Sequence, residues 1–177
     1  MFPIRKLALV VVVGCILSFI APMLLAQNQT RNEKAILRYR LMLQRRPKEG
    51  STFDRLYQFY LEGSGLDTMI LDYQAEAKTK PNAPNLQLIL GYVYKRLGKD
   101  QEAILAYQRA VELAPDDYYP YLVLGQTYVI QRRHEAAVSA LTQAADLSTY
   151  AQSATSEERI AIFRALGRAH LGRDQVD

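Results

Sequence analysis

The chain has 177 residues, 49% of them hydrophobic, so it is long enough to bury one sizeable core without disulfides or a metal ion. Its single cysteine, Cys15, excludes an internal disulfide and a metal site built from several thiolates. Twenty-two Lys and Arg residues stand against eighteen Asp and Glu residues, and Arg5 and Lys6 belong to an N-terminal leader. This near balance predicts no dedicated polyanionic partner, so no nucleic acid is expected.

Segment 1–26 has the order of an export signal. A short basic lead, MFPIRK, precedes twenty residues without a charge, LALVVVVGCILSFIAPMLLA, and the polar sequence QNQTRNEK follows. The apolar run approaches the roughly 20 residues that span a bilayer as a helix, while Ala26 offers a small residue at a cleavage site. The pattern fits both a cleaved signal peptide and an anchor that holds residues 7–26 in a membrane. We therefore expect an exported protein of the periplasm or cell envelope, secreted or anchored.

Segment 27–49 is predicted to be a basic linker with one helix, which would be half of the helix-hairpin repeat described in the next paragraphs. Between residues 31 and 48 seven Lys or Arg residues accompany one acidic residue, Glu33. This run favours a solvated helix face over a surface for nucleic acid or lipid headgroups. Its apolar spacing and the closing Pro47 are typical of the second helix of a hairpin whose first helix is missing.

The chain repeats with a fixed period, which the evenly spaced prolines Pro47, Pro81 and Pro115 mark. Three columns of large residues keep the same period: Tyr39, Tyr73, Tyr107 and Leu141; Tyr60, Tyr94 and Tyr128; and Leu56, Leu90 and Leu124. Within one period the apolar residues recur three and four apart, which predicts two helices separated by a break at 98–100 and ended by Pro115. Each period is therefore predicted to form a helix hairpin.

Small residues mark the expected crossing of the two helices in a hairpin. Gly91 and Ala103 in one period, like Gly125 and Ala137 in the next, allow two backbones to approach closely. The period also predicts that Tyr107 and Leu141 fill the space between one hairpin and the next, and that Tyr94 and Tyr128 keep their hydroxyls at the wet edge.

These residues and their spacing resemble the tetratricopeptide repeat signature, in a protein of an exported or membrane-anchored bacterial type. The signature residues are Leu90, Gly91, Tyr94, Ala103, Tyr107 and Pro115, repeated as Tyr121, Leu124, Gly125, Tyr128, Ala137 and Leu141. The resemblance implies an all-α fold, an α-solenoid of antiparallel helix hairpins that forms a superhelix after the N-terminal apolar helix. Full repeats are expected at 84–117 and 118–151, and a partial repeat or terminal helix at 152–177. In the weaker repeat at 50–83, Tyr57 and Met69 replace small residues, so its helices are expected to stand further apart.

The resemblance further implies a concave groove, lined by the first helix of each hairpin, that receives a peptide or helix of another protein. The residues expected on this groove are Asp54, Gln58, Leu61, Leu88, Tyr92, Lys95, Arg96, Tyr119, Leu122, Gln126 and Val129. Four of them, Leu88, Tyr92, Tyr119 and Leu122, are expected to form an exposed apolar centre. Family members that bind chaperones hold a C-terminal carboxylate in this groove, but Leu88 and Tyr92 occupy the matching positions here, so that activity is not expected.

No catalytic, cofactor or metal site is predicted. His134 and His170 lack a second His or Cys at ligand spacing, and Asp116 and Asp117 are explained as acidic residues that stabilise a helix start. The leading hypothesis is a non-catalytic interaction module or scaffold for a protein or peptide partner. Two alternatives stay open: a structural assembly subunit that self-associates through its terminal repeats, and the N-terminal arm of a longer enzyme or regulator.

Overall fold

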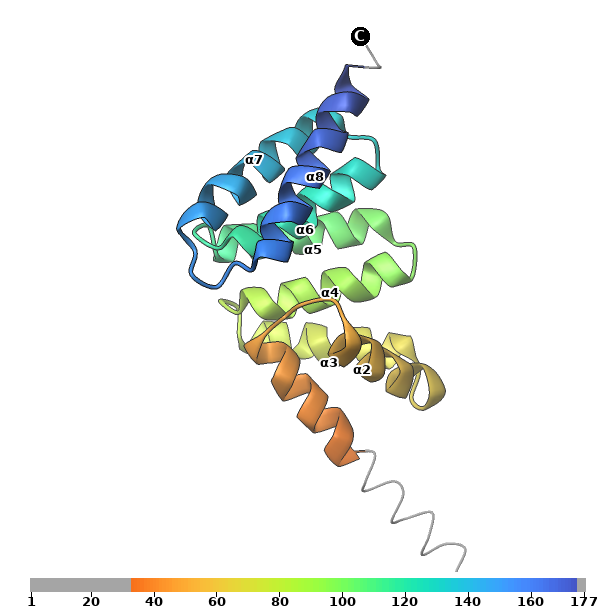
Figure 1. The fold of residues 1–177 in the computed structure, drawn as a ribbon. Coiled ribbons are helices and arrows are strands. Elements are labelled where there is room, and N and C mark those ends of the chain that lie inside the picture. Colours follow the sequence, from red (N-terminus) through yellow and green to blue (C-terminus); the bar gives the residue numbers. More distant parts are fainter. Residues whose placement is uncertain (1–32, 175–177) are drawn as a thin grey trace, which may run out of the picture. The chain divides into compact units, whose positions relative to one another are not determined.

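The structure is a computed structural model that describes residues 33–174, in which every regular element is an α-helix (Figure 1). Residues 33–45 are helical. Seven helices follow: α2 (Ser51–Glu62), α3 (Leu66–Thr79), α4 (Pro84–Arg96), α5 (Asp100–Leu113), α6 (Tyr118–Ile130), α7 (His134–Tyr150) and α8 (Ser156–Arg173). The chain divides into two units after Leu41, and the arrangement described here is that of the second unit.

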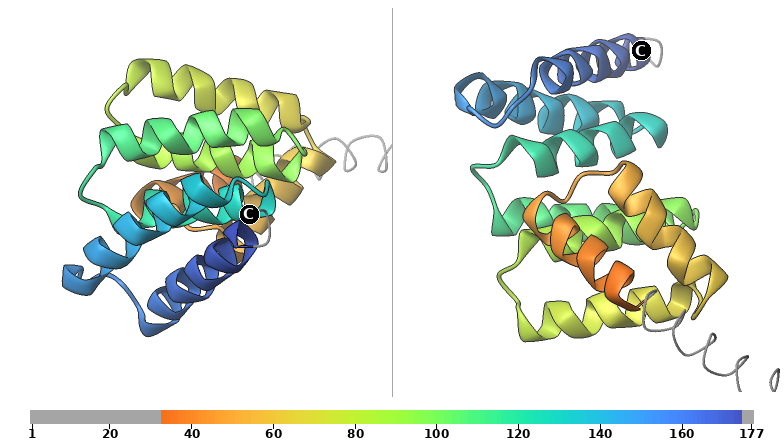
Figure 2. Two further views of the ribbon diagram at one scale, coloured as in Figure 1. Left: turned by 90° about the horizontal axis from the view of Figure 1, so that it is seen from above. Right: turned by 60° about the horizontal axis from the view of Figure 1, so that its bottom comes forward.

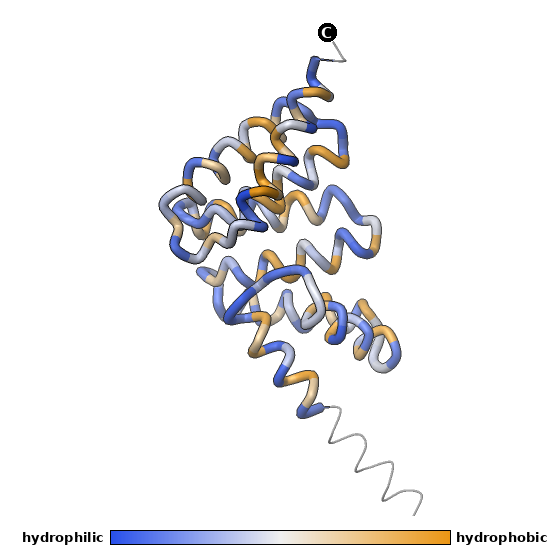
Figure 3. Tube along the Cα trace, viewed as in Figure 1, coloured by the Kyte–Doolittle hydropathy of each residue, from blue (hydrophilic) through white to orange (hydrophobic). Residues whose placement is uncertain are grey.

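Helices α4 and α5 form one antiparallel hairpin, α6 and α7 form the next, and α8 packs on α7 (Figure 2). The pairs α2/α3, α4/α5 and α6/α7 fall within segments 50–83, 84–117 and 118–151, and α8 falls within 152–177. Apolar and polar stretches alternate along the helices (Figure 3), as expected for helices that bury one side. The all-α hairpin architecture expected from the sequence period is confirmed.

Local signals explain where the helices begin and turn. Pro84 opens α4 at a position that needs no amide hydrogen, and the Asp117 carboxylate accepts a hydrogen bond from the Tyr119 amide at the start of α6. The turns inside the two hairpins need a left-handed residue, supplied by Gly98 (φ 69°) and, at the equivalent position of the next repeat, by Arg132 (φ 56°). A residue with a Cβ is strained in this conformation, so the second turn keeps its shape at a small cost.

Two glycines let the hairpin helices approach. A Cβ on Gly91 would lie closer than 3.0 Å to the Tyr107 ring, and a Cβ on Gly125 would lie 2.5 Å from Leu141 Cγ. The period predicts Tyr107 and Leu141 between successive hairpins, whereas the structure places each one against the glycine of its own hairpin. The structure thus supports the expected close approach of the two helices in a hairpin. The side chains that pack against Gly91 and Gly125 there are Tyr107 and Leu141.

The tyrosines Tyr94 and Tyr128 join successive hairpins through their hydroxyls. Gln74 Nε2 donates to Tyr94 Oη at 2.9 Å, and Gln108 Nε2 donates to Tyr128 Oη at 2.9 Å. Both bonds connect a second helix with the first helix of the next hairpin, and they use equivalent positions of successive repeats. The Tyr94 and Tyr128 hydroxyls, which were expected at the solvent-exposed edge, therefore each accept a hydrogen bond from a glutamine at the same position of the preceding repeat.

The first pair, α2 and α3, is looser than the others. It makes far fewer close approaches than α4 with α5 or α6 with α7. Met69 is buried where the other hairpins have Ala103 and Ala137, and Tyr57, in the glycine column, lies near Phe53 with a ring distance of 5.9 Å. This agrees with the wider spacing expected from the large residues at these positions.

The export or anchor segment 1–26 lies outside the described residues. Within residues 33–174, none of the helices has the length and apolar character required to cross a membrane.

Candidate interaction surfaces

Helices α4, α6 and α8 contribute side chains to one surface, which we call the inner face. Lys95 at the end of α4, Val129 and Ile130 of α6, and Arg164 and Arg168 of α8 all line one pocket of about 250 Å³. Gln126, Ala161 and Ala165 complete its lining. Side chains from these three helices thus line one pocket.

Residues 44–54, which we call the strap, cross part of this inner face. The strap consists of the last two residues of the helix at 33–45, the link 46–50 and the first turn of α2. Asn85 Nδ2 donates to the Gln44 carbonyl at 2.7 Å, and Tyr92 Oη donates to the Pro47 carbonyl at 2.6 Å. The Phe53 ring lies edge-on to the Tyr92 ring at 5.5 Å. The strap therefore covers the inner face over α4.

Ion pairs fix the middle of the strap to the end of α4. Glu49 accepts from Lys95 Nζ at 2.8 Å and from Arg96 Nε at 3.4 Å. Arg96 also pairs with Asp54, and its guanidinium lies 5.5 Å from the centre of the Phe53 ring. Because these groups are partly exposed, each ion pair contributes modestly to stability, and their main effect is to fix the position of the strap.

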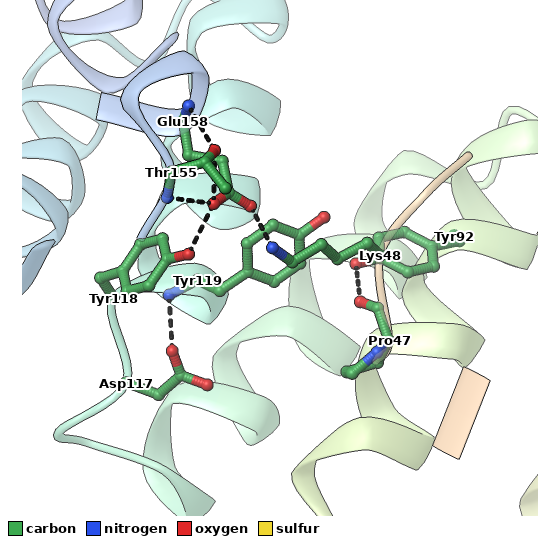
Figure 4. A network of polar contacts seen from close by, with 8 residues as sticks. All are labelled: Pro47, Lys48, Tyr92, Asp117, Tyr118, Tyr119, Thr155 and Glu158. Carbon is green, nitrogen blue, oxygen red and sulfur yellow. Dashed lines mark hydrogen bonds and ion pairs between the residues drawn. The ribbon is translucent and has the colours of Figure 1, made fainter. Parts of the chain in front are cut away.

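A second anchor joins the strap to the start of α8 (Figure 4). Lys48 pairs with Glu158, and its ammonium lies over the Tyr119 ring, 5.4 Å from the ring centre. Glu158 also accepts from Tyr118 Oη and from the Thr155 amide, each at 2.9 Å. Thr155 Oγ1 in turn accepts from the Glu158 amide, so the two residues form a capping box at the start of α8. One carboxylate thus connects the strap, α6 and α8.

This setting changes the acidity of both hydroxyl and carboxyl groups. Burial raises the pKa of Glu158, but hydrogen bonds from Lys48, Thr155 and Tyr118 outweigh it and lower the pKa to about 2. Burial and the bond to Glu158 raise the pKa of the Tyr118 phenol. Glu158 is therefore a permanent anion and Tyr118 a permanent donor at neutral pH.

A further cavity of about 540 Å³ lies between the strap and the start of α6. The strap side is lined by Arg45, Arg46, Pro47 and Lys48, and the other side by Asp117, Tyr118, Tyr119, Gln152, Ser153 and Thr155. Three basic residues and one acidic residue, Asp117, line this cavity, and the Lys48 ammonium is already paired with Glu158. A separate pocket of about 570 Å³ lies between α3, α4 and α5 and includes Ala77 and Leu105.

The expected apolar centre of the groove is not exposed. Leu88, Tyr92 and Leu122 are 2%, 0% and 3% exposed, so their placement on an exposed stripe is wrong. Tyr92 packs between Phe53 of the strap and Tyr107 of α5, because burying a large ring is worth more than leaving it in solvent. Tyr119 is half-buried under Lys48.

The other expected groove residues divide into three groups. Lys95, Arg96 and Asp54 are engaged by the strap ion pairs. Gln126 and Val129 line the open pocket between α6 and α8, and Gln58 and Leu61 are exposed on α2. Contact of any of them with a partner stays a prediction.

The sequence reasoning missed the strap, together with Arg164 and Arg168. The acidic residues Glu49 and Asp54, next to a basic run and matched by Lys95 and Arg96, were the available signal for the strap. Sequence spacing alone gives no pairing between segments that belong to different repeats. In the part of the chain that the structure describes, no cluster of three His, Cys, Asp or Glu side chains is placed to hold a metal ion.

Comparison with known proteins identifies the repeat. A family model described as "TPR repeat" matches residues 91–131, and one described as "Tetratricopeptide repeat" matches residues 118–150. Together with the hairpins α4/α5 and α6/α7, these matches show that residues 91–150 contain tetratricopeptide repeats. Such repeats present extended surfaces for other proteins, which supports a protein-interaction or scaffold role.

Two solved structures match this chain. One, titled "Crystal structure of MamA", has a TM-score of 0.47 at 19% identity and covers 84% of this chain and 92% of its own. The other, titled "Crystal structure of MamA protein", has a TM-score of 0.49 at 19% identity and covers 84% of this chain and 86% of its own. No curated protein matches the sequence.

Proposed function

We propose that the chain is a non-catalytic scaffold that binds a segment of a partner protein on its inner face, in the pocket between α6 and α8. The supporting observation is that this pocket is open while the neighbouring part of the face over α4 is covered by the strap. Its apolar lining includes Val129, Ile130 and Ala161, and Ile130 is 66% exposed. An exposed branched side chain in a groove is a suitable anchor point for an apolar residue of a partner.

We also propose that segment 1–26 exports this scaffold. The support is the order of basic lead, apolar core and polar exit in the sequence. Export would place the repeats in the cell envelope, held at the membrane through residues 7–26 if the segment is retained. Cell fractionation with N-terminal sequencing tests this: recovery of the full chain in the cytoplasm with Met1 present would contradict it.

Site-specific photo-cross-linking tests the binding surface. A photoreactive amino acid at the position of Ile130 should capture a partner protein in cells, whereas the same amino acid at Leu105, which is similarly exposed at 57% but lines the pocket between α3, α4 and α5, should not. Equal capture from both positions would show that the inner face has no special role.

A pair of filling variants then ties the capture to the pocket. Ala161→Trp places a large ring in the pocket between α6 and α8, and Ala77→Trp does the same in the pocket between α3, α4 and α5. We expect Ala161→Trp, introduced with the photoreactive group at Ile130, to reduce capture at least tenfold and Ala77→Trp to leave it unchanged. Circular dichroism of both variants checks that the helices are intact. Unchanged capture with Ala161→Trp would overturn the proposed pocket.

A further inference from the structure

The pocket between α6 and α8 is lined by cations and by no acidic residue. Its charged lining residues are Lys95, Arg164 and Arg168. Lys95 already binds a carboxylate, that of Glu49 in the strap. Within residues 33–174, Arg164 and Arg168 form no ion pair, and both are exposed. The pocket therefore carries two positive charges that the described chain does not neutralise.

The placement of the two arginines is unfavourable for the helix alone. They lie four residues apart on α8, so they share one face about 6 Å apart along the axis. Two like charges at this spacing destabilise a helix by repulsion. The next helix on this side, α6, offers Gln126, Val129 and Ile130 and no carboxylate in return.

On this basis we propose that the inner face recognises an acidic segment of a partner protein, with two carboxylates held by Arg164 and Arg168 and an apolar side chain on Ile130. This inference rests on the proposed function and names the class of its partner. Two side chains about 6 Å apart on one side match alternate residues of an extended segment, which repeat about every 6.6 Å, and also residues four apart on a helix. Guanidinium groups bind carboxylates through two parallel hydrogen bonds, so Arg at both positions favours carboxylates.

The strap shows the same recognition within the chain. It approaches the inner face with two acidic residues, Glu49 just before α2 and Asp54 in the first turn of α2, and it places the apolar Phe53 between Arg96 and Tyr92. The inner face over α4 thus holds the strap by pairing carboxylates with cations and by packing an apolar ring on the helix. The pocket between α6 and α8 also offers cations and an exposed apolar side chain, and no strap residue lines it.

Fluorescence anisotropy with two synthetic peptides tests the inference. The probe is a labelled peptide of alternating Glu and Leu, and its control has Gln in place of every Glu. We expect the full-length chain to bind the Glu peptide at least tenfold more tightly than the Gln peptide, with an affinity that falls as salt rises. Equal binding of the two peptides would overturn the inference.

Charge-reversal variants locate the effect. Arg164→Glu with Arg168→Glu should weaken the Glu peptide at least tenfold, and Arg164→Lys with Arg168→Lys should weaken it less, because the charge remains but the paired hydrogen bonds are lost. The matched control, Arg109→Glu with Lys78→Glu, makes the same change in net charge away from this pocket and should leave binding unchanged. Equal loss in both double variants would show a general charge effect and overturn the inference.

Two further outcomes separate this inference from its alternatives. If vesicles of phosphatidylglycerol or a single-stranded oligonucleotide bind with the same dependence on Arg164 and Arg168, the surface recognises anions in general, and the inference of an acidic protein segment is wrong. If cross-linking from Ile130 captures a partner equally well in the Arg164→Glu, Arg168→Glu variant, the proposed function stands and the acidic partner is excluded.

Discussion

The hairpin α6/α7 and the helix α8 carry the same repeat feature in two different states. In the hairpin, Leu141 of the second helix fills the space beside Gly125. In α8 the corresponding Gly167 has no atom within 4 Å of an added Cβ, and Ile160 and Phe163 on the same helix are exposed. A glycine thus marks a crossing when a second helix is present, and the identical residue in α8 is open surface.

The two regions also differ in what holds them in place. The two helices of each hairpin are held together by close apolar packing, with Ala103, Ala137, Tyr107 and Leu141 fully buried. Helix α8 packs on α7, buries Ile162, Ala165 and Ala169, and is tied at its start to the strap and α6 through Glu158. The comparison indicates that shape complementarity dominates in one region and charge and hydrogen bonding contribute more in the other.

The largest expected effect on the free energy of unfolding distinguishes Gly125 from Gly167. Gly125→Leu forces a side chain into Leu141 and should lower the free energy of unfolding by about 3 kcal/mol or more through overpacking. Gly167→Ala should raise it by about 0.5–1 kcal/mol, because alanine is the better helix former and the site is open. Urea unfolding followed by circular dichroism measures both. An unchanged stability of Gly125→Leu would show that the hairpin is wrongly assigned.

A medium effect is expected at the start of α8. Glu158→Gln keeps an oxygen that can accept from Thr155 and Tyr118 but loses the charge that pairs with Lys48, so it should cost about 1–2 kcal/mol at neutral pH. The folded pKa of about 2 lies below the ordinary value, so the parent carboxylate stabilises the fold above about pH 4.5 and loses this contribution as pH falls toward 2.

Stability measured against pH checks this prediction. The difference between the parent and Glu158→Gln should be constant near neutral pH and shrink as the pH falls from about 4.5 to 2. A difference that stays the same at low pH would mean that Glu158 is not held as an anion by its neighbours.

The smallest effect is expected in the middle of the strap. Glu49→Gln removes the ion pairs with Lys95 and Arg96, which are partly exposed, so it should cost less than about 1 kcal/mol. The cost should shrink further in high salt, whereas that of Gly125→Leu should not, because packing is not screened. Urea unfolding of both variants in low and high salt makes the comparison, and a salt-independent cost for Glu49→Gln would contradict the ion-pair description.

Much of the fold could be predicted from residues that recur at a fixed spacing along the sequence. The repeat columns of Gly91 with Gly125 and of Tyr94 with Tyr128 predicted the hairpins, because each repeat solves the same local packing problem with the same residue types. The partner of each glycine was less accessible: the period does not say whether Tyr107 fills its own hairpin or the next.

The binding surface was harder to predict. Helical spacing puts Tyr92 and Leu122 on the side of their helices that faces the groove, but it does not say whether another segment covers that side. Here the strap reaches Tyr92 through Pro47 and Phe53, and the open part of the groove lies beside Arg164 and Arg168 instead.

The sequence by itself determined the helices, their pairing into tetratricopeptide hairpins and the export-like order of the first 26 residues, because these depend on composition and on spacings within about one repeat. Only the tertiary structure decided that the strap covers α4 and that Lys48 reaches Glu158, 110 residues further along the chain. Such long-range contacts form from the summed geometry of several packed helices, and small changes in that geometry move a side chain from solvent into the core. For this reason the repeat could be read from the sequence, while the part of its surface left open for a partner could not.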